Sequence, residues 1–353
     1  MHSLTSLQTL RAAAAWMVVT HHYMQIVHGF QHTSLAGRFF SEAGGFAVEV
    51  FFVISGFIMH FSLTKNPIAA PEFMVRRLMR IVPAYWIATL IFVLVIALLP
   101  PSAAPQNAWT WSSLAKSLLF WPHQNPSGLG TYPTLTVGWS LNFEMFFYVL
   151  LSVTLGLVGK RWFGSTVAFL LLLPVVWPVE WLGSAVASSS LIRLFAFGML
   201  LSSLFVRRQG RLLPKSDLSC RWWLALVVLA CCVALLGRPL PLLWRVESLL
   251  MQALACGLVW TVVINENWFQ RWPAARLWKY LGDASYSTYL LHPSAMFCLL
   301  GLSVTQSTWA KQESFFVAYL VLTGLLSHLS YRVIESGQLA RRLQRWFLVK
   351  LKR

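Results

Sequence analysis

The sequence predicts an all-α protein, a polytopic membrane protein with about ten transmembrane helices and both termini in the cytoplasm. Of its 353 residues, 57% are hydrophobic and only 11% are charged, whereas a soluble domain carries about 25% charged residues. The apolar residues gather in runs close to the roughly 20 residues that a helix needs to cross a bilayer. The Lys and Arg residues lie mostly in alternate connections between these runs.

A hydropathy window of about 19 residues identifies ten candidate spans. They lie near residues 7–28, 44–64, 83–100, 137–158, 163–179, 188–206, 222–237, 244–264, 280–301 and 314–334. With a cytoplasmic amino terminus, 22 Lys and Arg residues fall on the cytoplasmic side and six on the other. The positive-inside rule therefore predicts cytoplasmic termini. The net charge of +17 is explained by this orientation, so we expect no nucleic-acid partner.

The first span, LQTLRAAAAWMVVTHHY, contains Arg11, His21 and His22. An arginine at the centre of a span costs about 2.5–3.5 kcal/mol on insertion scales, so it usually has a partner or a function. Arg11 and His22 are eleven residues apart, which is roughly 16 Å along a helix and nearly the same face. His21 points about 100° away, and we expect it to have a structural role.

Three later spans carry polar groups at about the depth of the first-span histidine. Glu49 lies in the second span, Glu144 in the fourth, and His292 in the ninth. Pro293 removes a helical hydrogen bond and predicts a bend beside Tyr289. Such bends are tolerated where protein or a wet cavity satisfies the backbone, so the ninth span is expected to form a cavity wall.

The segment RRLMRIVPAYW places Arg76, Arg77 and Arg80 just before the third span, on the cytoplasmic side. Three guanidinium groups on one helix surface are suited to binding phosphates. Anchoring to anionic lipid headgroups is an equally physical explanation, and composition alone favours it.

Other elements have simpler expected roles. Ser55-Gly56 in the second span is expected to permit close helix approach. The connection 101–136 contains a short amphipathic piece around Trp109–Trp121. Glu335 is expected to pair with Arg332 at the cytoplasmic face. The five cysteines have no metal-ligand spacing and are interpreted as packing residues.

Six ordered motifs resemble one family. They are LQTLRAAAAWMVVTHHY, GGFAVEVFFVISGFIM, RRLMRIVPAYW, WSLNFEMFFY, YLGDASYSTYLLHP and YRVIE. In this order they are similar to membrane-bound acyltransferase family 3, and most of all to its exopolysaccharide O-acetyltransferase (ExoZ-like) branch. The resemblance covers about residues 7–335. It implies an acyltransferase-3 transmembrane domain over 1–340 and a basic cytoplasmic tail over 341–353, with no SGNH hydrolase-like domain.

The resemblance implies an O-acetyltransferase of the bacterial inner membrane. Its donor would be cytoplasmic acetyl-CoA, without a metal. Its acceptor would be a hydroxyl of an exopolysaccharide or other cell-surface glycan, free or lipid-linked. The family's essential first-helix pair maps onto Arg11 and His22, and its donor-binding arginines map onto Arg76, Arg77 and Arg80.

The chemistry then suggests roles for the remaining polar residues. His22 would take the hydroxyl proton, with Glu144 or Glu49 holding its imidazole. Arg11 would contact the pantetheine or phosphate part of the donor. We expect His292, Tyr289 and Glu49 on the acceptor side. Many relatives have Asp in place of Glu49 and a second acid beside Glu144, so these supporting roles are less firmly implied.

Two other classes of function remain open from the residues. A transporter or flippase of a glycan or small metabolite would also need buried charges and a kinked helix. It would not need a basic site for CoA, and binding of acetyl-CoA separates the two. A metal or haem site is disfavoured, because His21 and His22 cannot both point into one site from a regular helix.

Overall fold

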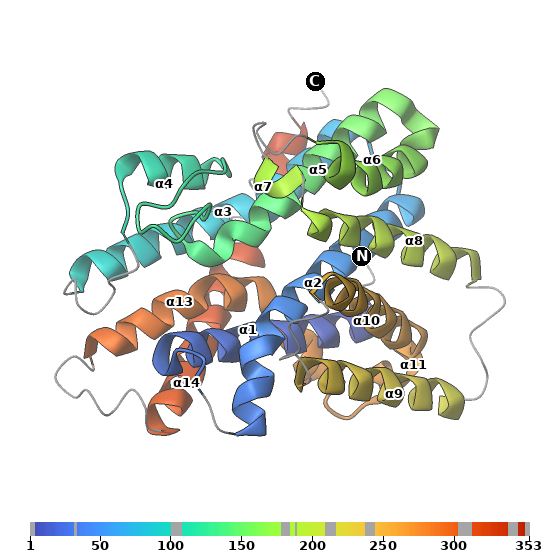
Figure 1. Cartoon of the computed structure of the whole chain (residues 1–353). Helices are drawn as coiled ribbons and strands as arrows, with labels where there is room; N and C mark the ends of the chain where they lie inside the picture. The colour runs from blue at the N-terminus through green and yellow to red at the C-terminus, as the bar shows by residue number, and fades with distance from the viewer. Residues whose placement is uncertain are drawn as a thin grey trace. The chain divides into compact units, whose positions relative to one another are not determined.

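The architecture comes from a computed structural model of the whole chain (Figure 1). The structure describes residues 4–31, 34–99, 108–177, 184–187, 189–208, 217–236, 244–302, 313–337 and 345–349. These residues form helices, turns and irregular connections, and none of them lies in a strand. The predicted all-α fold class is therefore confirmed over the described part of the chain.

Each of the ten predicted spans falls on a helix. The ten are α1 (Thr5–His28), α2 (Leu35–Lys65), α3 (Ala70–Leu98), α5 (Trp139–Val158), α6 (Trp162–Val176), α8 (Arg193–Arg208), α9 (Asp217–Leu236), α10 (Trp244–Ile264), α13 (Ser285–Leu302) and α14 (Glu313–Ser330). Shorter helical elements are α4 (Trp111–Leu118), α7 (Ser184–Ala187), α11 (Glu266–Arg271), α12 (Ala275–Asp283) and a π-helix over Tyr331–Glu335.

Five helical segments of the described residues are long and apolar enough to cross a membrane. They are Leu35–Lys65, Ala70–Leu98, Thr136–Val176, Ser190–Arg208 and Glu313–Glu335. Two shorter apolar helices cover Arg221–Leu236 and Ser248–Ile264. The chain is thus an apolar, multi-helical membrane protein, while ten crossings and cytoplasmic termini stay predictions.

Two helices begin well before the spans that hydropathy predicts. The side chain of Ser34 accepts a hydrogen bond from the backbone N–H of Gly37 and starts α2 at Leu35. Pro71, in the first turn of α3, has no N–H to leave unpaired. The arginine-rich segment therefore lies inside α3 and not before it. A hydropathy window finds the apolar centre of a helix, whereas its polar cap sets where it begins.

The chain divides into two compact units, which are described separately. Unit 1 contains Met1–Pro67, Val167–Leu172 and Ser190–Ser285. Unit 2 contains Ile68–Thr166, Leu173–Ser189 and Tyr286–Arg353.

Unit 1 is built on the contact between α2 and α8. A Cβ atom on Gly56 would lie 2.1 Å from the carbonyl oxygen of Phe195, and one on Gly198 would lie 2.1 Å from that of Val53. Each glycine thus admits the backbone of the other helix, which confirms the close approach predicted at Gly56.

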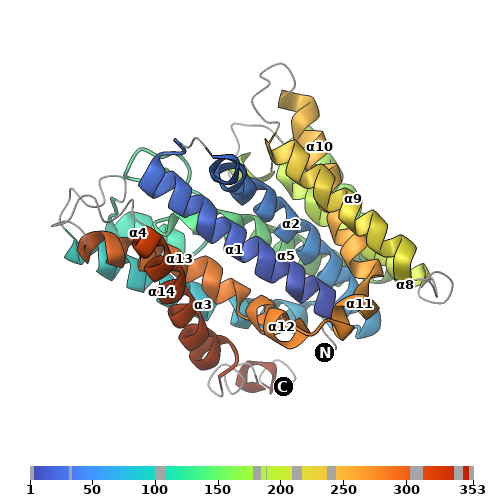
Figure 2. The same cartoon turned by 90° about the horizontal axis from the view of Figure 1, so that it is seen from below.

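The first helix packs on the same unit. α1 runs alongside α2 and also contacts α10, α11 and α12 (Figure 2). Gly282 of α12 approaches the backbone of α1 so closely that a Cβ there would lie 2.0 Å from the carbonyl oxygen of Gln8. Backbone contacts, as well as side-chain contacts, therefore fix where α1 lies along its own axis relative to α12.

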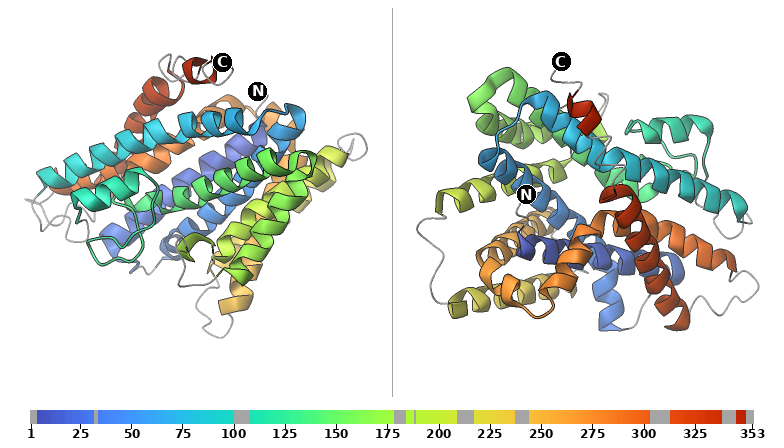
Figure 3. Two further views of the ribbon diagram at one scale, coloured as in Figure 1. Left: turned by 90° about the horizontal axis from the view of Figure 1, so that it is seen from above. Right: turned by 180° about the vertical axis from the view of Figure 1, so that it is seen from behind.

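Unit 2 is organised around α3, α5, α13 and α14. α3 packs against α5, and the two run beside one another in Figure 3, where α3 is light blue to cyan and α5 is green. The amphipathic piece predicted near Trp109–Trp121 forms α4, which starts with a capping box between Thr110 and Ser113. Trp86 of α3 donates to the carbonyl of Leu118 at 2.8 Å and ties α4 to this unit.

Candidate functional site

The polar stripe of α1 forms as predicted. Arg11 and His22 lie on one uninterrupted helix and are both partly buried. The residues between them include the fully packed Ala15 and Val18. The rise of a regular helix separates the two side-chain positions by roughly 16 Å.

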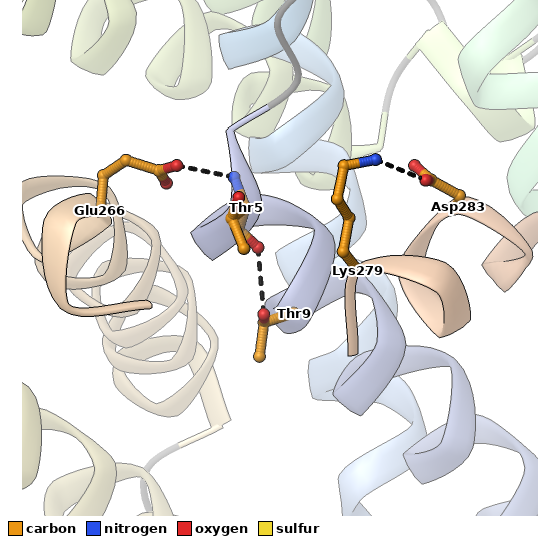
Figure 4. A network of polar contacts seen from close by, with 5 residues as sticks. All are labelled: Thr5, Thr9, Glu266, Lys279 and Asp283. Carbon is orange, nitrogen blue, oxygen red and sulfur yellow. Dashed lines mark hydrogen bonds and ion pairs between the residues drawn. The ribbon is translucent and has the colours of Figure 1, made fainter. Parts of the chain in front are cut away.

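The start of α1 is fixed by a remote carboxylate. The N-cap residue, Leu4, offers no side-chain cap. Instead the two carboxylate oxygens of Glu266, from α11, accept the backbone N–H groups of Thr5 at 2.8 Å and Ser6 at 2.9 Å. Figure 4 shows the contact with Thr5. Gln270 donates to the same carboxylate at 2.7 Å. A negative charge at a helix N-terminus also matches the helix dipole, so α1 begins at a defined point.

The imidazole of His22 is oriented by its own helix. Its Nδ1 lies 3.0 Å from the carbonyl oxygen of Val18, which can only accept a hydrogen bond. In the neutral ring Nδ1 must then carry the proton and Nε2 the lone pair. His22 therefore has the tautomer of a general base that acts through Nε2.

The neighbouring His21 packs against α2. A Cβ on Gly44 would lie 2.3 Å from the His21 ring, so the ring occupies the space that this glycine leaves. His21 and His22 meet edge to face, with ring centroids 5.2 Å apart. This packing supports the structural role expected for His21.

Glu49, predicted on the acceptor side, is partly buried on α2 in unit 1. The negative charge of Glu49 acts electrostatically on the thiol of Cys256 in α10. α10 packs against α2.

The three arginines of α3 lie in three different environments. Arg76 forms an ion pair with Glu72, one turn earlier, at 2.6 Å. Arg77 is buried, with 9% of its surface exposed, and Arg80 is exposed. The sequence suggested one surface cluster, but consecutive helical residues point about 100° apart, so Arg77 turns inward while its neighbours do not.

Arg77 lies in a polar layer inside unit 2. Its guanidinium carbon is 5.6 Å from the centroid of the Phe73 ring. The Tyr148 hydroxyl and the Glu144 carboxylate stabilise the positive charge of this guanidinium electrostatically. Tyr148 donates to Glu144 Oε1 at 2.5 Å, one helical turn apart on α5. Sequence reasoning missed Tyr148, although its spacing of four residues from Glu144 could have identified it.

The polar layer extends to α13 through residues that the sequence did not single out. The Tyr286 hydroxyl donates to the carbonyl of Ile81 at 2.9 Å. Glu144 and Glu335 both act electrostatically on Tyr286. Among the described residues of unit 2, the buried Arg77, Tyr148 and Tyr286 therefore lie with the partly buried carboxylates of Glu144 and Glu335.

Tyr289 and His292, predicted to bind the acceptor, are packed within α13 and its neighbours. The Tyr289 hydroxyl donates to the carbonyl of Val137 at 2.6 Å and lies 2.9 Å from the Ser140 hydroxyl, at the start of α5. His292 is fully buried, and its Nδ1 lies 3.2 Å from the carbonyl of Thr288. Both side chains make contacts that stabilise the fold.

Glu335 ends the π-helix and caps α13. Its Oε1 accepts the backbone N–H of Ser287 at 3.1 Å and also the hydroxyl of Ser287. Ser287 is the third residue of α13, so its N–H is one of those that a helix start leaves unpaired. The sequence suggested Arg332 as the partner of Glu335, and a contact across 48 residues could not be found by helical spacing.

Metal ligands do not gather in the part of the chain that the structure describes. No group of three or more His, Cys, Asp or Glu side chains there is placed to hold a metal ion. The chemistry available to the described residues is that of an imidazole base, buried carboxylates and guanidinium groups.

Comparison with known proteins gives these groups a family context. The model of the acyltransferase domain of family 3 matches residues 4–332. The exopolysaccharide production protein ExoZ of Rhizobium meliloti (strain 1021) is 31% identical over 309 residues, covering 84% of this chain and 90% of that protein. No solved structure matches the chain. With its helical membrane fold and a family match over nearly its whole length, the chain belongs to the acyltransferase 3 family of membrane proteins.

Proposed function

We propose that this protein is an O-acetyltransferase of the bacterial inner membrane. It moves an acetyl group from cytoplasmic acetyl-CoA to a hydroxyl of an exopolysaccharide or another cell-surface glycan. The family membership and the similarity to an exopolysaccharide production protein support the reaction class and the kind of acceptor. The single observation on which the proposed site depends is the contact between His22 Nδ1 and the carbonyl oxygen of Val18, which leaves the imidazole lone pair on Nε2.

The proposed reaction uses His22 as the general base. Nε2 takes the proton of the acceptor hydroxyl while the acceptor oxygen bonds to the thioester carbonyl carbon. The carbon–sulfur bond then breaks, and the proton passes from the imidazolium to the CoA thiolate. A positioned base contributes about 10²–10⁴ to the rate of such a step.

The other predicted residues divide between the two substrates. Arg76, Arg77 and Arg80 bind the phosphates of the donor, and Arg11 contacts its pantetheine or phosphate part. On the acceptor side, Glu49 is proposed to contact the saccharide directly, whereas Tyr289 and His292 act by shaping the wall against which it lies. The contacts of Tyr289 and His292 inside unit 2 support this indirect role.

The test compares the cell's polysaccharides with and without the protein. Wild type restored to a deletion strain is expected to return the acetyl mass increment to the glycan. His22→Ala is expected to lose it while the protein stays inserted, whereas His28→Ala, another histidine of α1, is expected to keep it. Full acetylation by His22→Ala would remove the assigned base, and an unchanged glycan in the deletion strain would remove the proposed reaction.

A further inference from the structure

We propose that Glu144 and Tyr148 are positioning residues for Arg77, and that Arg77 is the one of the three donor-binding arginines of α3 that holds an anionic group from inside unit 2. The ligand chemistry is a phosphate or diphosphate, as in the nucleotide part of the acyl donor. This inference rests on the proposed function, because it names the residues that position one of the donor-binding arginines.

The first step is that Arg77 is buried without being neutralised by a direct partner. Its Nε is buried and has no hydrogen-bond partner among the described residues. Within the same described ranges, the ion pairs of α3 include Arg76 with Glu72 but none for Arg77. A buried guanidinium is costly unless it is hydrogen-bonded to an opposite charge. An anionic ligand supplies that charge, and its oxygens match the planar donor fork of arginine.

The second step is that the surroundings keep the guanidinium charged and in place. Phe73, one turn before Arg77, presents its ring to the guanidinium, and the Phe73 and Tyr148 rings meet edge to face at 6.0 Å. The hydroxyl of Tyr148 gives its proton to Glu144. The Tyr148 hydroxyl and the Glu144 carboxylate both stabilise the positive charge of the Arg77 guanidinium.

The third step is that this connection leaves donors of Arg77 available. Tyr148 is a neutral phenol whose hydroxyl donates to Glu144, so it does not fill the guanidinium fork in the way that a bidentate carboxylate would. Arg76 shows the opposite case. Both Nε and Nη2 of Arg76 donate to Glu72, at 3.1 and 2.6 Å, so a carboxylate already uses two of its three nitrogens.

The experiment measures binding of CoA and the kinetics of acetyl-CoA turnover with the full chain in lipid nanodiscs. Tyr148→Phe and Glu144→Gln are expected to raise Kd for CoA and KM for acetyl-CoA about 10- to 100-fold, the range for losing a hydrogen bond to a charged group. The kcat is expected to change less than about threefold. Glu72→Gln, the matched control on α3, is expected to stay within about twofold because exposed pairs contribute little.

A role in folding alone would lower the amount of active protein but leave KM and Kd unchanged, which would overturn the inference. Arg77→Lys keeps the charge but removes the fork, and it is expected to raise Kd as Tyr148→Phe does; an unchanged Kd would also overturn it. If the wild-type protein binds no CoA, the proposed function is wrong. If the wild type binds CoA and all three variants bind it equally well, only the present inference is wrong.

The nanodiscs also separate two sources of phosphate. They are prepared from zwitterionic lipid alone and with added anionic lipid. CoA affinity that depends on Tyr148 in both preparations supports a soluble donor. If instead Tyr148→Phe changes only the retention of anionic lipid and not CoA binding, Arg77 holds a lipid headgroup and the inference is wrong.

Discussion

α1 carries His22 and α13 carries His292, the two histidines that the sequence assigns to the reaction site. The two helices are built in similar ways, but the surroundings of their imidazoles differ. Each helix has its N-terminus held by a remote glutamate, Glu266 for α1 and Glu335 for α13. Both imidazoles place Nδ1 against the carbonyl four residues earlier. His22, however, is partly exposed on an uninterrupted helix, whereas His292 is fully buried and precedes Pro293.

The comparison of His22 with His292 shows that the tautomer of an imidazole does not by itself identify a general base. Both rings have their lone pair on Nε2 when neutral. A general base must also reach the proton that it removes, at a heavy-atom distance of about 2.6–3.2 Å. Partial exposure leaves His22 able to meet a substrate, whereas the fully buried His292 is proposed to shape the acceptor side only indirectly. The predictions below test this distinction.

The largest expected effect comes from replacing each histidine with asparagine. The Asn amide can still donate to the preceding carbonyl, but it has no basic nitrogen. His22→Asn is expected to lower kcat about 10²–10⁴-fold. His292→Asn is expected to keep kcat per folded molecule within about tenfold. Turnover of acetyl-CoA by purified variants measures both, and equal losses at the two positions would contradict the distinction.

Removing the cap of α1 is expected to have the next largest effect. Glu266→Ala leaves the N–H groups of Thr5 and Ser6 without their acceptor. Unpaired buried groups cost about 1–3 kcal/mol each, so we expect about 2–4 kcal/mol of lost unfolding free energy. Denaturant unfolding in detergent measures it, with Glu266→Gln retaining part of the stability. No change in the alanine variant would show that water can cap α1.

Removing the cap of α13 is expected to have the smallest effect. Glu335 accepts one backbone N–H and one hydroxyl, both from Ser287, and this hydroxyl also contacts Ser330 at 2.8 Å. Glu335→Ala is therefore expected to cost about 1–2 kcal/mol. The same unfolding assay applies. A larger loss than for Glu266→Ala would reverse the ranking of the two caps.

The sequence was sufficient to predict the helices but not their tertiary partners. Runs of apolar residues identified each of the ten helices of 15 or more residues in the described part of the chain, because burial in lipid requires continuous backbone hydrogen bonding. The start of α3 was missed because its first turns are polar. The stripe of Arg11 and His22 could be predicted from helical periodicity, since both residues lie on one helix.

The environment of a side chain could not be predicted where it depends on contacts distant in sequence. Arg76 and Arg77 are adjacent, yet one pairs with Glu72 and the other turns toward Tyr148 and Glu144. The cap of α1 joins residues 260 positions apart. Helical spacing predicts only contacts within a helix, so the partners of Arg77 and the cap of α1 required the structure.

The cap of α1 has a consequence for biosynthesis. The ribosome makes a chain from its amino terminus, so α1 enters the bilayer long before residue 266 has been translated. Until then its opening N–H groups depend on water or headgroups at the surface. The helix with the proposed catalytic imidazole therefore receives its cap only when the last quarter of the polypeptide emerges, and a chain truncated before that point carries His22 on a helix whose first turn is uncapped.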